Sequence, residues 1–258
     1  MAGSDVAKWT RLAALGLLLA GMAPALLLAA IFIWGLDAGD ELVFFVSAMV
    51  IPLAGAFLVW RFGTWAKLVA ILAAVVTAMA LFWTAFGLTE PASFFDFVPG
   101  LLLIPGCLLA IGASIAALVA NKRGCVSSAP KGGEKVGIAI AVVTVVLAAV
   151  ISGALNLTLR SSADAAGAQA AVTFKNFEFS EAGYALEGGT QVFVRNDDPF
   201  VHTFTIDELG IDERLLGGGS TIIDIPAEPG TYVVYCRPHT VDPQDPSQVD
   251  MAAAFTVL

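Results

Sequence analysis

The side chains best suited to chemistry gather near the C-terminal end of the chain. Cys236 and His239 stand together in "YCRPH", Met251 follows after eleven intervening residues, and His202, the only other histidine, precedes them. Two imidazoles, one thiolate and one thioether make up the donor set of a trigonal copper site with a weak axial ligand. We therefore predict a copper site formed by His202, Cys236 and His239, with Met251 as the weaker fourth ligand.

This donor set favours one-electron chemistry. A thiolate is a soft ligand, imidazole binds both oxidation states of copper, and a long thioether bond leaves the geometry between their preferences. Taken singly, each residue could have a structural role without a metal, because a lone histidine can be structural and a lone cysteine can be a buried apolar side chain. Cys236 is the only cysteine after Cys125, so this part of the chain cannot form an internal disulfide.

The sequence around these residues predicts short β-strands. Apolar and polar residues alternate, with punctuating Gly and Pro, in segments 172–179, 190–196, 201–206, 220–226, 231–236 and 251–258. The first segment slips phase at Asn176, and only "IDELGIDERLL" could form a short helix. Strands at such regular spacing predict a small β-sandwich or barrel over residues 171–258.

The preceding part of the chain has a different composition. Five apolar stretches lack any charged residue or histidine, and each is long enough for a membrane span, which requires roughly twenty residues. They are residues 12–36, 42–60, 68–88, 97–120 and 136–157. We predict a membrane domain of five transmembrane helices over residues 1–159. A small, polar tether over residues 160–170 joins it to the β domain.

Charged residues between these stretches predict the orientation. All eight basic residues before Arg160 fall on one side of a five-span arrangement, and the opposite loops carry only acidic residues. The positive-inside rule then places the N-terminus in the cytoplasm and the C-terminal domain outside the plasma membrane. The first stretch could instead be a cleaved signal peptide, although it exceeds the usual apolar core of about 7–15 residues. Its removal would leave the orientation of the rest unchanged.

Three stretches of the C-terminal part of the chain resemble those of a known family. "EGGTQVFVRNDDPFVHTF", "PAEPGTYVVYCRPH" and "MAAAFTVL" resemble the ligand-bearing segments of the cupredoxins, the plastocyanin- and azurin-like blue copper proteins. The resemblance implies a Greek-key β-sandwich with type 1 copper, in which Met251 is the axial ligand. The loop between His239 and Met251 is longer than the family usually has. Gln244, Gln248 or no residue at all therefore remain alternatives for the axial position.

The resemblance implies an electron carrier rather than an enzyme, because related copper enzymes use additional histidine-rich centres. We expect a protein that moves single electrons on the outer face of the membrane, in a respiratory or related redox chain. The alternative is copper handling or sensing, with helices that transport or signal. Residues 160–258 hold five basic and fifteen acidic side chains. This balance predicts a redox partner protein with a basic docking patch and argues against nucleic acid.

Three residues near His202 could tune the site. Asn196, Asp197 and Thr203 are able to hydrogen-bond the ligand loop, although each could equally cap a turn. The sequence leaves both readings open.

Overall fold

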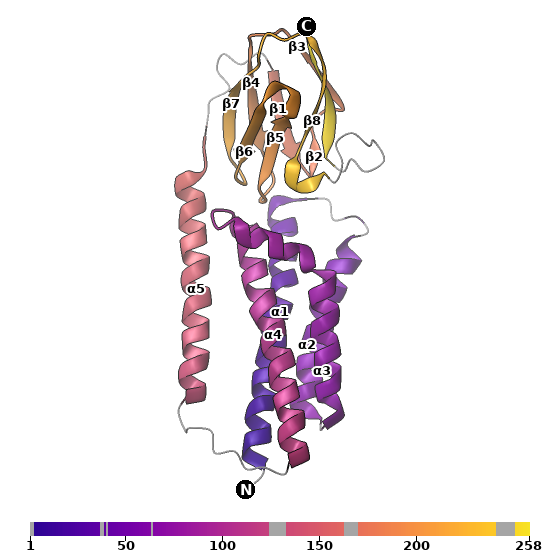
Figure 1. Cartoon of the computed structure of the whole chain (residues 1–258), viewed down its shortest axis with the longest axis vertical. Coiled ribbons are helices and arrows are strands. Elements are labelled where there is room, and N and C mark those ends of the chain that lie inside the picture. The colour runs from indigo at the N-terminus through magenta and orange to yellow at the C-terminus, as the bar shows by residue number, and fades with distance from the viewer. Residues whose placement is uncertain are drawn as a thin grey trace. The chain divides into compact units, whose positions relative to one another are not determined.

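The computed structural model describes residues 3–36, 39, 41–62, 64–123, 133–162, 170–240 and 251–258. The chain divides into a helical unit and a β unit (Figure 1). The helices are α1 (Gly3–Trp34), α2 (Glu41–Arg61), α3 (Thr64–Ala80), the 3-10 helix η1 (Phe82–Thr89), α4 (Phe94–Arg123) and α5 (Gly133–Leu159).

Three of these helices are long and apolar enough to cross a membrane. They are α1 over Lys8–Trp34, α2 over Leu42–Arg61 and α4 over Phe94–Lys122. The bent pair of α3 and η1 makes a fourth if it counts as one span, and the shorter apolar helical stretch in α5 is Val145–Leu159. Within the described residues the N-terminal region is thus helical with three candidate spans, and the predicted number of five is not confirmed.

The predicted span 68–88 is not one straight helix. The axis bends by 59° between α3, which ends at Ala80, and η1. Beyond the break, η1 closely approaches α4, because a Cβ on Gly87 would clash with the Asp96 carbonyl oxygen. A Cβ on Gly100 would similarly lie 2.4 Å from the Thr84 carbonyl oxygen. Two glycines therefore let η1 lie directly against the beginning of α4, where an unbroken helix would continue past it.

Glycines also allow α1 and α4 to cross closely. A Cβ on Gly16 would lie 2.5 Å from the Ala110 nitrogen, and one on Gly106 would lie 2.7 Å from the Ala20 nitrogen. Small residues commonly bring the backbones of membrane helices together in this way.

The β unit consists of two sheets that share one core. The strands are β1 (Ala170–Lys175), β2 (Glu178–Phe179), β3 (Gly183–Leu186), β4 (Gln191–Asn196), β5 (His202–Ile206), β6 (Ile211–Leu215), β7 (Ser220–Asp224), β8 (Gly230–Tyr235) and β9 (Ala252–Val257). One sheet has the order β2-β1-β4-β7 and the other β3-β9-β8-β5-β6. Phe174 from the first sheet and Phe204 and Phe255 from the second are fully buried in the common core. The prediction of an all-β C-terminal domain is therefore correct.

One local prediction needs correction, and a second is met only in part. The first predicted strand is a hairpin, because Asn176 and Phe177 form a turn with φ of 57° and 60° between β1 and β2. A two-residue turn with both φ values positive matches the twist of paired strands, and it accounts for the phase slip at Asn176. The segment "IDELGIDERLL" forms the short 3-10 helix η2 (Asp207–Leu209) and then strand β6, with Gly210 in the left-handed region between them.

Candidate metal centre

His202 begins strand β5 and is completely buried. Its pairing with Leu215 of β6 fixes the backbone, and the edge of its ring packs against Phe174 with the ring centroids 5.5 Å apart. Its Nδ1 atom lies 3.1 Å from Nδ1 of His239, and its Nε2 atom lies 2.8 Å from a carboxylate oxygen of Asp198. The two nitrogens of this ring thus face different groups.

Cys236 follows strand β8 directly and is also completely buried. Its backbone N–H donates to the Met251 carbonyl at 3.0 Å, which joins the end of β8 to the beginning of β9. The backbone N–H of Thr203 donates to its sulfur at 3.3 Å. Because a backbone donor favours negative charge on the sulfur, this contact suits a thiolate.

His239 lies in the 3-10 turn η3 (Arg237–His239) that follows Cys236. Its N–H donates to the Cys236 carbonyl at 3.1 Å, which folds the turn back on the cysteine. The Nδ1 atom of His239 lies 3.2 Å from the Cys236 sulfur, and that sulfur lies 3.5 Å from Nδ1 of His202. The ring is only partly buried, and Phe177 covers it at a centroid distance of 5.1 Å.

The structure therefore brings together the three side chains that the sequence proposes as strong ligands. Within the described residues, His202, Cys236 and His239 form the group of side chains able to hold a metal ion, with all donor atoms within 4.8 Å of one another. A single thiolate with two imidazoles suits copper, and the pair of Nδ1 atoms facing one sulfur makes a trigonal arrangement. The residues present thus fit a copper ion.

Met251 lies beside this group and is 1% exposed. Its carbonyl accepts hydrogen bonds from the Cys236 N–H and, at 2.9 Å, from the Thr240 hydroxyl. These contacts hold Met251 next to Cys236 and Thr240. Met251 must lie close to the cysteine if it is to act as a ligand. The alternative axial residues Gln244 and Gln248 lie outside the described residues. The choice among Met251, either glutamine and no axial ligand therefore stays a prediction.

Asp198 is a buried residue of the site that the sequence reasoning missed. Its side chain is 0% exposed, as is that of His202. Burial alone would raise the pKa of Asp198, but hydrogen bonds from His202 and from the backbone of Phe177 and Asn176 outweigh it and lower the pKa. The only sequence signal was the run "NDDPFVH", in which a carboxylate precedes the histidine by four residues.

The two histidines have opposite electrostatic environments. Burial alone would lower the pKa of His202, but its hydrogen bonds with Asp198 and Cys236 outweigh this and raise the pKa to about 9. Burial, together with the nearby charge of His202, lowers the pKa of His239 to about 3. Without a metal, these pKa values make His202 a charged imidazolium at neutral pH, whereas His239 stays neutral.

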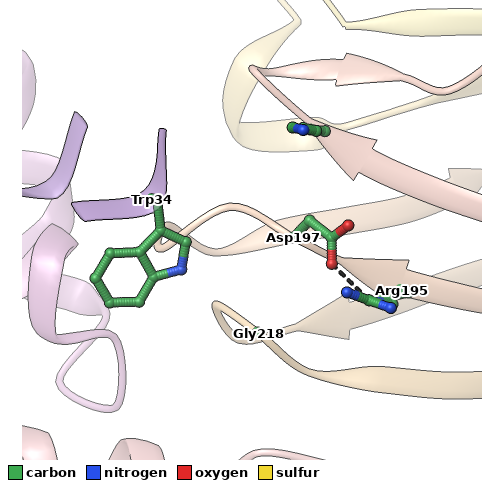
Figure 2. A pocket seen from close by; sticks show the side chains of 5 residues that line it. Trp34, Arg195, Asp197 and Gly218 are labelled. Atoms are coloured by element: carbon green, nitrogen blue, oxygen red, sulfur yellow. Dashed lines mark hydrogen bonds and ion pairs between the residues drawn. The ribbon is translucent and has the colours of Figure 1, made fainter. Parts of the chain in front are cut away.

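The three residues suggested as tuning groups have different roles. The Asn196 amide donates to the Phe200 carbonyl at 2.8 Å and fixes the turn before His202. Asp197 hydrogen-bonds the Arg195 guanidinium, as Figure 2 shows, and is partly exposed. Thr203 does contact the ligand loop, the segment from Cys236 to His239, because its hydroxyl accepts the backbone N–H of Arg237 at 2.8 Å.

Comparisons with known proteins agree with this architecture. The family model described as "Cupredoxin-like domain" matches residues 141–244. Among curated proteins no similar sequence was found.

Several solved structures are similar to part of the chain. An oxidized mutant of amicyanin is 17% identical, with 38% of this chain and 90% of that chain covered and a TM-score of 0.31. A purple cupredoxin from Nitrosopumilus maritimus is 20% identical over 35% and 100% of the chains, with a TM-score of 0.27. A chain of a heme-copper terminal oxidase dimer is 16% identical over 49% and 99%, with a TM-score of 0.27.

The sheet order, the donor atoms and the family match thus converge on one description. The C-terminal β domain is a cupredoxin-like domain, in which His202, Cys236 and His239 are positioned like a type 1 copper site.

Proposed function

We propose that this protein is a membrane-anchored copper protein that carries single electrons, with His202, Cys236 and His239 as the strong ligands and Met251 as the axial ligand. The observation that carries the proposal is the convergence of two Nδ1 atoms on one cysteine sulfur at 3.2 and 3.5 Å. A copper ion bound there supplies a one-electron couple. The protein supplies a fixed donor set, a buried thiolate and one partly exposed imidazole.

The residues around the site support electron transfer without release of the metal. Cys236 and His202 are fully buried, and backbone hydrogen bonds hold the segments on which they lie. His239 alone among the three is partly exposed, so its ring edge is the natural exit for an electron. We expect copper to resist a weak chelator, whereas a copper-handling protein would lose it rapidly.

The helices support attachment to a membrane. We propose five spans, formed by α1, α2, the bent pair of α3 and η1, α4, and α5. The distribution of basic residues favours a cytoplasmic N-terminus and a cupredoxin-like domain outside the cell membrane. Protease added to intact cells should then remove this domain, while permeabilised cells should be needed for cleavage between α4 and α5.

The charge of the outer domain supports an electron-transfer partner of opposite charge. Residues 160–258 carry five basic and fifteen acidic side chains. Complementary charge accelerates encounter and makes it sensitive to salt. We propose a redox protein with a basic docking patch, in a respiratory or related chain.

Spectroscopy of the full-length, copper-loaded protein in detergent tests the proposal. Wild-type protein should show the intense blue absorption of a copper–thiolate site, and Cys236→Ser should abolish it. Cys107→Ser is the matched control, because Cys107 is buried in α4, outside the metal cluster, and its removal should leave the band intact. A copper-loaded wild-type protein without the band would refute the proposed function.

A further inference from the structure

We propose that Asp198 is a positioning residue that orients His202 and favours oxidised copper at the proposed site. This inference rests on the proposed function, and it adds a residue that lies outside the donor set. Asp198 is a carboxylate with 0% exposure that faces an equally buried ligand histidine. A carboxylate is costly to bury unless it is fully hydrogen-bonded, so its partners reveal its role.

Two of its partners are backbone N–H groups of the β1–β2 turn. Asn176 donates to Oδ1 at 2.8 Å and Phe177 donates to Oδ2 at 3.0 Å. Both residues have positive φ, in the left-handed region that residues with a side chain seldom adopt. Successive N–H groups in such a turn make a concave site for an anion. The turn is therefore shaped to hold a negative charge at this position.

The third partner is Nε2 of His202, at 2.8 Å from Oδ2. An anionic carboxylate accepts a hydrogen bond, so Nε2 carries a proton in this arrangement. Nδ1 faces Cys236 and His239, and its lone pair becomes available to a metal that displaces the Nδ1 proton. Asp198 thus selects the tautomer and the ring orientation that ligation requires, in the same way that carboxylates orient other metal-bound histidines.

The surrounding loop leaves the carboxylate little freedom to move. The Asp198 N–H donates to the Asn196 side chain at 3.0 Å, and its carbonyl accepts from Gly218 at 3.2 Å. A Cβ on Gly217 would lie 2.4 Å from the Pro199 oxygen, so two backbone segments are in direct contact here. The loop holds the carboxylate against His202 independently of any metal.

A fixed negative charge hydrogen-bonded to a ligand changes the balance between oxidation states. The carboxylate makes the imidazole a stronger electron donor, and a more basic ligand stabilises the more highly charged metal ion. Loss of such a partner typically lowers metal affinity about 10- to 100-fold. If that loss falls on oxidised copper, the reduction potential rises by about 60 to 120 mV, at 59 mV for each tenfold change.

The test compares two carboxylates that are adjacent in the sequence. The reduction potential of full-length protein is measured by spectroelectrochemistry for wild type, Asp198→Asn and Asp197→Asn. Both variants remove one charge, but the Asp197 side chain is 29% exposed and pairs with Arg195. We expect the potential to rise in Asp198→Asn and to stay near the wild-type value in Asp197→Asn. An unchanged potential in Asp198→Asn, or an equal rise in both, would overturn the inference.

A measurement on wild-type protein covers the case in which Asp198→Asn does not fold. The chain has only two histidines, so ¹⁵N-histidine labelling of the copper(I)-loaded protein, which is diamagnetic, gives four ring nitrogens. We expect a slowly exchanging proton on Nε2 of His202, with the partly exposed His239 as internal comparison. A proton on Nδ1 of His202, or fast exchange at Nε2, would disprove the role of Asp198. Failure of the proposed function is separate, because wild-type protein would then lack the blue band altogether.

Discussion

Thr203→Val should destabilise the β unit without removing the contact to the cysteine sulfur. The Thr203 hydroxyl accepts the Arg237 N–H at 2.8 Å and lies 2.9 Å from the Thr205 hydroxyl. The backbone N–H of Thr203, which valine retains, donates to Cys236. The substitution therefore separates two roles of one residue: the side chain holds the ligand loop, and the backbone contacts the sulfur.

The size of the change in the free energy of unfolding follows from the groups that lose a hydrogen bond. Thr205 keeps Asp212 as a partner at 2.8 Å, so its hydroxyl is not left unpaired. The Arg237 N–H, in a partly buried bond, loses its acceptor, and the loss of a typical hydrogen bond costs about 0.5–1.5 kcal/mol. Valine has nearly the same shape as threonine, so a cavity adds little. We expect the free energy of unfolding to fall by about 0.5–1.5 kcal/mol.

Pulse proteolysis of the metal-free, full-length protein in urea measures this change, because cleavage reports the unfolded population. Thr231→Val is the matched control, since Thr231 is exposed on β8 and its hydroxyl pairs with that of Thr256 in an exposed position. Surface substitutions of this kind usually stay within about 0.5 kcal/mol. Equal stability of Thr203→Val and wild type would refute the assigned role of the hydroxyl. Loss of the blue band in Thr203→Val would show that the two roles are not separable.

Two further predictions concern the helices and the effect of pH. Gly106→Val should lower the free energy of unfolding of the helical unit in detergent by about 1–3 kcal/mol, because the Cβ of the new valine would lie 2.7 Å from the α1 backbone. Gly112→Val should have little effect, because a Cβ there has no neighbour within 4 Å. Equal losses in a thermal unfolding assay would contradict the close crossing of α1 and α4. In metal-free protein, the unfolded chain binds more protons than the folded chain between the ordinary histidine pKa of 6.5 and the pKa of His239, about 3. The folded chain binds more protons between 6.5 and the His202 pKa of about 9. Stability should therefore peak near pH 6.5 and fall on both sides, and a flat pulse-proteolysis profile from pH 4 to 9 would be inconsistent with these shifts.

The donor set was predictable because its chemistry is local. Cys236 and His239 share one short turn, and the scarcity of histidine left His202 as the only other imidazole. Alternation also indicated most strands of the β unit, since buried and exposed positions follow the pleat. These features depend on residue type and short spacing, which a sequence displays directly.

Asp198 was not predictable in the same way. An aspartate in "NDDP" is typical of a turn, and here its burial depends on the left-handed residues Asn176 and Phe177, which lie in a different hairpin. Strand β3 was missed because it is only four residues long. The bend after Ala80 was missed because apolar composition measures the length of a span, whereas the contact between Gly87 and Asp96 arises from packing between helices.

The position of β9 has a consequence for how the protein is made. This strand comes last among the nine, yet it lies between β3 and β8 in the interior of its sheet. A nascent chain that has not yet added residues 252–257 exposes two open strand edges, which are sites of aggregation. The Cys236 N–H would also lack the Met251 carbonyl that holds it in place. Completion of this sheet, and of the backbone bond that holds Cys236, therefore waits for the docking of β9.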